Sequence, residues 1–240
     1  MGQAAESDRT SMDADRRPVR SRQWVVLQRV GMWLAQRGIK PNAISVASMV
    51  FALCGAVLML WASYHTGWLL RLACIGAAVC VQLRLLSNVL DGIVAERLTK
   101  ASPAGRLYNE WPDRVSDVLL LVGFGSLAVD GAGLTLGLLA ACLAVMTAYV
   151  RELGRAVDAP GVFLGPMAKP QRMAVLTVAL LAIAAWPVLA RKVFWGPGAA
   201  YGFVEAVLVV ITAGCILTAV RRLRHLHRHA ALQGADHDHE

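Results

Sequence analysis

Long runs of apolar residues without a single charged side chain are the feature that most constrains this chain. They cover residues 41–70, 131–150 and 173–190. A helix needs about 20 apolar residues to cross the hydrocarbon core of a bilayer. The chain is also 57% hydrophobic and only 17% charged, which is far more apolar than a soluble domain. The sequence therefore predicts an all-α integral membrane protein.

Six membrane spans are expected, at about residues 42–62, 68–95, 110–129, 134–151, 169–189 and 201–222. Apolar residues recur at near-helical spacing just before them, with Trp24 and Trp33 among them and Arg29 and Arg37 elsewhere, which predicts an interfacial amphipathic helix over 23–40. A short buried helix is the alternative.

The chain divides on this basis into four parts. Residues 1–22 are polar, lack periodicity and are predicted to form a disordered cytoplasmic segment. The interfacial helix over 23–40 leads into a six-span domain over 41–222, and residues 223–240 form a polar cytoplasmic tail.

The basic residues predict the orientation of the spans. They gather in the N-terminal segment, in the loops after the second and fourth expected spans and in the tail, whereas the alternate loops hold only Arg71, Arg191 and Lys192. By the positive-inside rule, both termini and the segment 88–117 face the cytoplasm. The net charge of +8 is therefore attributed to membrane topology and to anionic membrane lipids, and nucleic-acid binding is not expected.

Polar residues collect where the second expected span ends. Arg84, Asn88 and Asp91 are spaced four and three residues apart, so they share one face of a helix, and Gly92 lies beside them. The following linker, 99–106, contains proline and glycine and is predicted to be a turn. Such a turn would bring the polar faces of two antiparallel helices together.

The next expected helix opens with a second polar stripe. Asn109, Asp113 and Asp117 are each four residues apart, and Glu110 lies next to this stripe. Clustered carboxylates repel one another unless a cation lies between them, and Mg²⁺ and Mn²⁺ prefer carboxylate and amide oxygens. We therefore expect one or two Mg²⁺ or Mn²⁺ ions between the two helices, where they would clamp phosphate groups.

Two other interpretations remain open from the residues alone. Arginines close by in the sequence, Arg84 among them, could pair with the acids in a purely structural network. A small transporter would instead carry polar groups in several spans near the middle of the membrane. The fourth and fifth expected spans are almost free of charge, which disfavours the transporter.

The segment 88–113 resembles the signature of the CDP-alcohol phosphatidyltransferases. That signature reads D-x-x-D-G-x-x-A-R, then eight residues, then G-x-x-x-D-x-x-x-D, and this chain keeps every gap. The matching positions are Asp91, Gly92, Ala95, Gly105 and Asp113. The replaced positions are Asn88 for the first Asp, Glu96 for the Arg and Asn109 for the third Asp. The tripeptide Lys40-Pro41-Asn42 and the basic loop 165–172 also resemble the family, so the likeness covers nearly the whole chain.

The resemblance implies a reaction and roles for the matching residues. Members transfer a substituted phosphate from a CDP-linked donor, usually CDP-diacylglycerol, to an alcohol in phospholipid biosynthesis, and CMP leaves. Carried over, Asp91 is a metal ligand and Asp113 is a ligand or the general base. Gly92 and Ala95 line the cytidine site, with Glu96 in the place of the motif's Arg, and Gly105 supports the turn. The family is often dimeric, which implies a homodimer.

The replacements alter the expected metal site. Asn88 and Asn109 each remove a negative charge, but acids stand close to both gaps. The expected ligand set is Asn88, Asp91, Asn109, Glu110, Asp113 and Asp117. We interpret the chain as a divergent active transferase; a catalytically inactive relative that binds CDP-lipid or a partner enzyme is the alternative.

Basic residues after the fourth expected span are predicted to face the same site. They are Arg151, Arg155, Lys169 and Arg172. A basic cluster near a metal-bound pyrophosphate can hold an acceptor phosphate or the donor headgroup, and Lys169 and Arg172 are the preferred pair. The alternative is that these charges only set the topology. The acceptor is expected to be a polar alcohol of unspecified identity.

Overall fold

The computed structural model describes residues 25–97, 103–128, 132–157, 159, 164–191, 193–194 and 201–237. Within these ranges the side chains of 103–109, 193–194, 201 and 232–237 are outside the description. The segment 1–22, expected to be disordered, lies outside the described residues.

The described chain is almost entirely helical. Its elements are α2 (Val25–Gln36), α3 (Pro41–Ser63), α4 (Gly67–Arg97), α5 (Pro103–Gly125), α6 (Ala132–Ala156), α7 (Lys169–Ala185), the 3-10 helix η2 (Pro187–Ala190), β1 (Val193–Phe194), β2 (Tyr201–Gly202) and α8 (Phe203–His237). The strands β1 and β2 form a short antiparallel pair between η2 and α8. Each expected span overlaps one of the helices α3 to α8.

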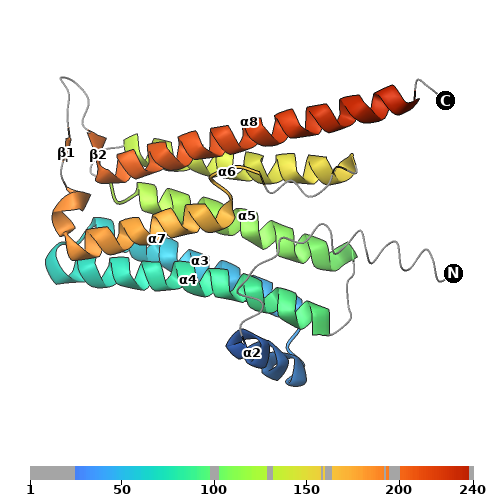
Figure 1. Cartoon of the computed structure of the whole chain (residues 1–240). Helices are drawn as coiled ribbons and strands as arrows, with labels where there is room; N and C mark the ends of the chain where they lie inside the picture. Colours follow the sequence, from blue (N-terminus) through green and yellow to red (C-terminus); the bar gives the residue numbers. More distant parts are fainter. Residues whose placement is uncertain are drawn as a thin grey trace.

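The long helices run side by side in a bundle (Figure 1). α3 packs on α4 and α5, α6 packs on α5 and α8, and α7 packs on α4. In Figure 1, α3 and α4 form one side of the bundle, α6 and α8 form the other, and α5 and α7 lie between them. The ends of α4 and α6 and the starts of α5 and α7 therefore come to the same end of the bundle, which we call the polar end.

Apolar side chains fill the bundle and also cover its outside. Met59, Phe124 and Leu180 are fully buried between the helices, whereas Val57 and Val178 on the same helices are more than half exposed. A soluble protein rarely exposes large continuous apolar surface. The outer apolar surface is therefore expected to face lipid.

Four described helices are long and apolar enough to cross a membrane: α3, α4, α6 and the Phe203–Ala231 part of α8. This is the composition of an integral membrane protein. α5 is long enough but carries several charged residues in its first half, and α7 is only 17 residues long. The bundle places both beside the four apolar helices (Figure 1).

Two helices extend beyond their expected spans, and the expected turn is wrong in its second half. α5 begins at Pro103, so the second half of the expected turn 99–106 is helical. Proline suits the first turn of a helix because its missing N–H has no helical partner there and its φ is already helical. α8 continues without a break to His237, so the expected polar tail is helical over most of its length and extends past the other helices (Figure 1).

The short helix α2 lies against the end of α4 (Figure 1). Its one buried residue is Gly31, and a Cβ added there would lie 2.5 Å from Cγ2 of Ile93. Arg97 at the end of α4 also donates a hydrogen bond of 3.2 Å to the side chain of Gln28. α2 is therefore attached to the last turns of α4, next to Asp91.

Glycines bring α5 into backbone contact with both of its neighbours. A Cβ at Gly137 of α6 would lie 2.8 Å from the carbonyl oxygen of Leu121, and Gly125 lies against the carbonyl of Gly133. On the opposite side, a Cβ at Gly123 would lie 2.8 Å from Cα of Ala56 in α3. The C-terminal half of α5 is therefore held by close helix packing that leaves no room for larger side chains.

Replacing Gly137 with valine should destabilise the bundle, because its Cβ would meet the backbone of α5. Overpacking of this kind costs about 1–3 kcal/mol, which would appear as a lower thermal unfolding temperature in detergent. Leu138→Val is the matched control, because Leu138 is half exposed on the outside of the same helix. Equal unfolding temperatures for the two variants would contradict the close α5–α6 contact.

Candidate functional site

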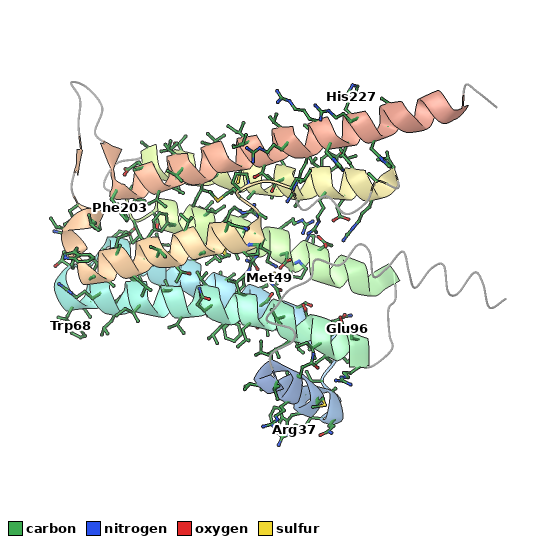
Figure 2. The ribbon with its side chains drawn as sticks, in the orientation of Figure 1. Arg37, Met49, Trp68, Glu96, Phe203 and His227 are labelled. Atoms are coloured by element: carbon green, nitrogen blue, oxygen red, sulfur yellow. The ribbon has the colours of Figure 1, made fainter. Side chains whose placement is uncertain are left out.

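Charged and polar side chains converge inside the polar end of the bundle. Figure 2 shows nitrogen and oxygen atoms between α4, α5 and α6 toward the end where Glu96 is labelled. Helix ends α4 and α6 and helix starts α5 and α7 supply them, because the chain reverses direction at that end between α4 and α5 and again between α6 and α7. The sequence predicts that the polar stripes of α4 and α5 face one another, and the surroundings of Asp91 and Asp113 test this prediction.

Asp91 is buried on the inner face of α4, with 5% of its surface exposed. The hydroxyl of Ser45 in α3 donates a hydrogen bond of 2.9 Å to its Oδ2. The Asp91 carboxylate also lies within electrostatic reach of Asp113 and Lys169. Three helices besides α4 thus contribute to the surroundings of this carboxylate.

Asp113 lies on α5 and is ion-paired through Oδ2 with Lys169 at the start of α7. Its Oδ1 is 3.7 Å from the NH2 of Arg84. That oxygen is buried and accepts no hydrogen bond from the described residues. The structure therefore pairs Asp113 with Lys169, places Asp91 within electrostatic reach of both, and leaves Oδ1 of Asp113 in an ion pair but without a hydrogen bond from the described residues.

The other motif positions of α4 lie around Asp91. Asn88 is half-buried, and its side-chain nitrogen is buried without a hydrogen-bond partner among the described residues. Because the oxygen and nitrogen of an amide are assigned from their partners, this side chain offers an uncommitted polar atom of either kind. Gly92 and Ala95 are half-buried, and Glu96 is exposed near the end of α4 (Figure 2). The side chains of the remaining motif positions, at 105 and 109, lie outside the description.

Asp117 is buried one turn beyond Asp113 and lies between two arginines. Arg84 of α4 donates a hydrogen bond of 2.7 Å to its Oδ1, and Arg172 of α7 donates one of 2.6 Å to its Oδ2. The exposed fractions of Arg84, Asp117 and Arg172 are 0%, 5% and 2%. The expectation that Arg84 pairs with an acid is confirmed, with Asp117 as that acid.

Arg172 has further partners inside the protein. Its NH1 donates hydrogen bonds of 3.2 Å to the hydroxyl of Thr147 and 2.9 Å to the carbonyl oxygen of Met167. Every contact that the structure shows for Arg172 is thus to the protein itself. Lys169, by contrast, is one quarter exposed and reaches Asp113.

The segment before α7 is held against α6 and α8. The backbone N–H of Met167 donates a hydrogen bond of 3.0 Å to the hydroxyl of Thr218. Arg222 donates hydrogen bonds to the carbonyl oxygens of Leu164, at 3.0 Å, and Thr147, at 2.6 Å. Gly165 has a φ of +117°, which favours glycine, and lies directly on Thr218. These contacts fix the direction in which the chain enters Lys169.

Glu110 belongs to a second polar cluster between α5 and α6. Both of its carboxylate oxygens are 2.7 Å from the NH2 of Arg151, and it also pairs with Arg114. Glu152 pairs with Arg151 and Arg155 in the same cluster. The predicted basic residues Arg151 and Arg155 are therefore ion-paired to glutamates, and Glu110 is placed with them and not with Lys169.

Three hydroxyl groups that support the site were not identified from the sequence. They are Ser45, Thr147 and Thr218, which bind Asp91, Arg172 and Met167. Each is a small polar residue in a largely apolar stretch of helix, where a polar group is expected to face the interior of the bundle. That signal was present in the sequence, but it does not say which partner each hydroxyl binds.

The oxygen-bearing side chains of the site are of the kinds that a hard divalent cation prefers as ligands. The described residues contain no group of three His, Cys, Asp or Glu side chains placed to hold a metal ion. They do contain the two carboxylates of Asp91 and Asp113. They also contain the amide of Asn88, although asparagine is not among these four residue types. Carboxylate and amide oxygens are the ligands that Mg²⁺ and Mn²⁺ prefer. The buried, unpartnered Oδ1 of Asp113 and amide of Asn88 are atoms that such an ion would satisfy.

Comparison with known sequences finds a relative but no matching family model. No family model matches the chain. The Escherichia coli (strain K12) protein "Inner membrane protein YnbA" is 25% identical over 155 residues, which are 65% of this chain and 73% of that protein.

Comparison with solved structures identifies the fold. The Mycobacterium tuberculosis phosphatidylinositol phosphate synthase PgsA1 in complex with manganese and citrate superimposes with a TM-score of 0.65 at 15% identity, over 83% of this chain and 88% of that one. The same synthase with CDP-DAG bound gives 0.65 at 16% identity, over 84% and 93%. Its apo form gives 0.62 at 16% identity, over 82% and 94%. The chain therefore has the fold of a phosphatidylinositol phosphate synthase, which supports the resemblance carried by the motif.

The two acids that pair with arginines should differ in what they contribute to stability. Removing one partner of a fully buried ion pair costs about 3–5 kcal/mol, so Asp117→Asn should strongly lower the free energy of unfolding. Glu110 is one quarter exposed, and pairs of this kind contribute about 0–1 kcal/mol, so Glu110→Gln should change it little. Unfolding in mixed micelles would compare the two variants; a larger loss for Glu110→Gln would contradict this assignment.

Proposed function

We propose that this protein is a membrane transferase that moves a substituted phosphate from a CDP-linked donor to an alcohol and releases CMP. The observation that carries the proposal is the ion pair of Asp113 with Lys169 at the polar end of the bundle, with the buried carboxylate of Asp91 within electrostatic reach of both. A motif prediction made two of these residues a metal ligand and a base, and a basic partner from α7 joins them. The fold around them is that of a phosphatidylinositol phosphate synthase.

The similar structures support the choice of donor and cofactor. One contains CDP-DAG and another contains manganese. We therefore propose CDP-diacylglycerol as the donor, Mg²⁺ or Mn²⁺ as the cofactor and phospholipid synthesis as the process. A polar alcohol is the acceptor.

The proposed metal-binding residues are Asn88 and Asp91 on α4 and Asn109 and Asp113 on α5. A divalent cation bound there would offset the charge of the donor pyrophosphate and of the departing CMP. Asp117 and Glu110, which the sequence also suggested as ligands, hold arginines in the structure. In this proposal Asp117 and Glu110 hold neighbouring helices together through these ion pairs and do not contact the substrates.

Asp113 is proposed as the general base. Its Oδ2 is paired with Lys169, and its buried Oδ1 has no hydrogen-bond partner among the described residues, so Oδ1 is the atom that can accept the proton of the acceptor hydroxyl. The hydroxyl oxygen then attacks the phosphorus that carries the lipid. The bond from that phosphorus to the bridging oxygen breaks, and CMP leaves with the electron pair.

Other residues around Asp113 are proposed to receive the substrates. Lys169 is one quarter exposed and would bind a phosphate oxygen of the donor or acceptor. Gly92 and Ala95 are small and half-buried beside Asp91, which suits the close approach of a nucleotide, and Glu96 lies at the exposed edge. Arg172 would act indirectly, because it holds the carbonyl of Met167, two residues before Lys169.

The proposed site opens to the cytoplasm from a domain of six spans. α5 and α7 lie in the bundle beside the four apolar helices, and their buried residues Leu121, Phe124, Leu176 and Leu180 belong to the same core. The basic residues of the chain gather at the polar end, which is typical of a cytoplasmic face. α2, with exposed Val26 and Trp33, would lie in the membrane interface.

Purified protein in detergent should release CMP from CDP-diacylglycerol when given a pool of polar alcohols and Mg²⁺ or Mn²⁺. Asp113→Asn should reduce the rate by roughly 100-fold or more, because general base catalysis contributes that much, and Asp91→Asn should raise the metal concentration required. Omitting one alcohol at a time would identify the acceptor. Chelation of the metal should abolish release.

Glu205→Gln is the matched control. Glu205 is also a buried acid, but it accepts a hydrogen bond from the backbone of Gly202 at the opposite end of the bundle. Its loss should leave the rate per folded molecule unchanged. Metal-dependent CMP release that Asp113→Asn does not reduce would contradict the role of this site.

A second candidate is a non-catalytic relative that binds CDP-lipid or a partner enzyme. Two observations favour it: Asn88, Glu96 and Asn109 replace charged motif residues, and the Lys169 ammonium already neutralises Asp113. Measurable binding of CDP-diacylglycerol without CMP release, for any alcohol and either metal, would support it over the transferase.

A further inference from the structure

Arg84, Asp117 and Arg172 form a buried ionic triad that connects α4, α5 and α7 directly beneath the proposed site. We propose that Arg84 and Arg172 are positioning residues: fixed by Asp117, they set the positions of Asp113 and Lys169 for metal and substrate binding. The inference rests on the proposed function. None of the three residues falls on a position of the motif that the chain resembles, so this role belongs to the chain's own sequence.

One arm of the triad ends at Asp113. The NH2 of Arg84 lies 2.7 Å from Oδ1 of Asp117, 3.2 Å from the backbone carbonyl oxygen of Asp113 and 3.7 Å from the Oδ1 of Asp113. A single guanidinium nitrogen thus contacts both the main chain and the carboxylate of the proposed base. Its own position is fixed by Asp117, since its contact with that residue is the shortest of the three.

The other arm ends next to Lys169. Arg172 donates to Oδ2 of Asp117 and, through NH1, to the carbonyl oxygen of Met167. Met167 is in turn held by the hydroxyl of Thr218 in α8. The segment that leads into Lys169 is therefore attached through Arg172 to the same carboxylate that orients Arg84. Asp113 and Lys169 pair with one another, and both are connected to Asp117. Arg84 makes the connection to Asp113, and Arg172 makes the connection to the segment before Lys169.

The energetics of the triad favour a role other than stability. A buried ionic triad is often no more stable than apolar residues of similar volume. Here Nε and NH1 of Arg84 and Nε of Arg172 are buried and make no hydrogen bond to the described residues, which adds a desolvation cost. An arrangement selected only to hold three helices together would not need charges with unsatisfied donors. Fixed geometry at Asp113 is the benefit that the contacts themselves show.

The test compares removal of one charge with removal of the whole triad. Asp117→Asn leaves two buried guanidinium groups facing one another, so it should lower both the melting temperature and the affinity for Mn²⁺. The triple variant Arg84→Met/Asp117→Leu/Arg172→Met removes all three charges of the triad and should recover the melting temperature. Mn²⁺ binding, measured from the free-ion electron paramagnetic resonance signal in detergent, should stay weakened roughly 10- to 100-fold, as for outer partners of metal ligands.

Arg71→Met is the matched control. Arg71 is also an arginine of α4 that holds α7, but at the opposite end, where it donates to the carbonyl oxygens of Ala184 and Ala185. Its loss should lower the melting temperature and leave Mn²⁺ affinity unchanged. Arg84→Lys gives a second test that does not depend on the triple variant folding: a point charge cannot reproduce the contacts of the guanidinium, so Mn²⁺ affinity should fall with little change in melting temperature.

The outcomes separate this inference from the proposed function. If the unchanged protein binds Mn²⁺ in a manner that requires Asp113, and the triple variant or Arg84→Lys binds it equally well, the triad is only structural and the inference is overturned. If the unchanged protein shows neither Asp113-dependent Mn²⁺ binding nor CMP release, the proposed function fails and the inference falls with it.

Discussion

The burial of Asp117 is the constraint on which the polar end depends. A carboxylate inside an apolar bundle must be paired, because transferring it from water without a partner costs roughly several kcal/mol. Asp117 satisfies this with Arg84 from α4 and Arg172 from α7, so three helices meet at one residue. Asp113 and Lys169 lie one turn closer to the end of the bundle and inherit their positions from that junction.

The polar end contains two clusters with different character. The cluster around Glu110 and Arg151 is one fifth to two fifths exposed and lies between α5 and α6, and each of its two glutamates pairs with more than one arginine. The cluster around Asp91 and Asp113 is more buried and retains unsatisfied atoms, namely Oδ1 of Asp113 and the amide of Asn88. Unsatisfied buried polar atoms are rare in folded proteins unless water, an ion or a ligand meets them. At the cluster around Asp91 and Asp113, these are the atoms that the proposed metal ion would satisfy.

Much of the fold could be predicted from the sequence because apolar runs and their polar boundaries are local signals. The helices α3 to α8 lie where they were expected, and the convergence of Asp91 and Asp113 follows from helical spacing on two consecutive antiparallel helices. The position of Glu110 did not follow, because three residues on a helix leave it about 60° from Asp113, enough to face α6. Asp91, to which Ser45 donates a hydrogen bond, lies on a different helix, so only the tertiary structure could reveal this pair.

The glycines of α5 and α6 have a consequence for how such a site can change. Gly123 and Gly125 press the backbone of α5 against α3 and α6, so the rotation of this helix about its own axis is fixed by shape, far from any charge. The orientation of its first turns therefore has a support from helix packing in addition to the ion pairs of Asp117. A residue on that half of the helix that makes no contact with the ionic triad can be exchanged without changing the rotation of the helix. In this bundle, the glycine contacts that set the rotation of α5 are thus separate in sequence from the polar residues that would carry out chemistry.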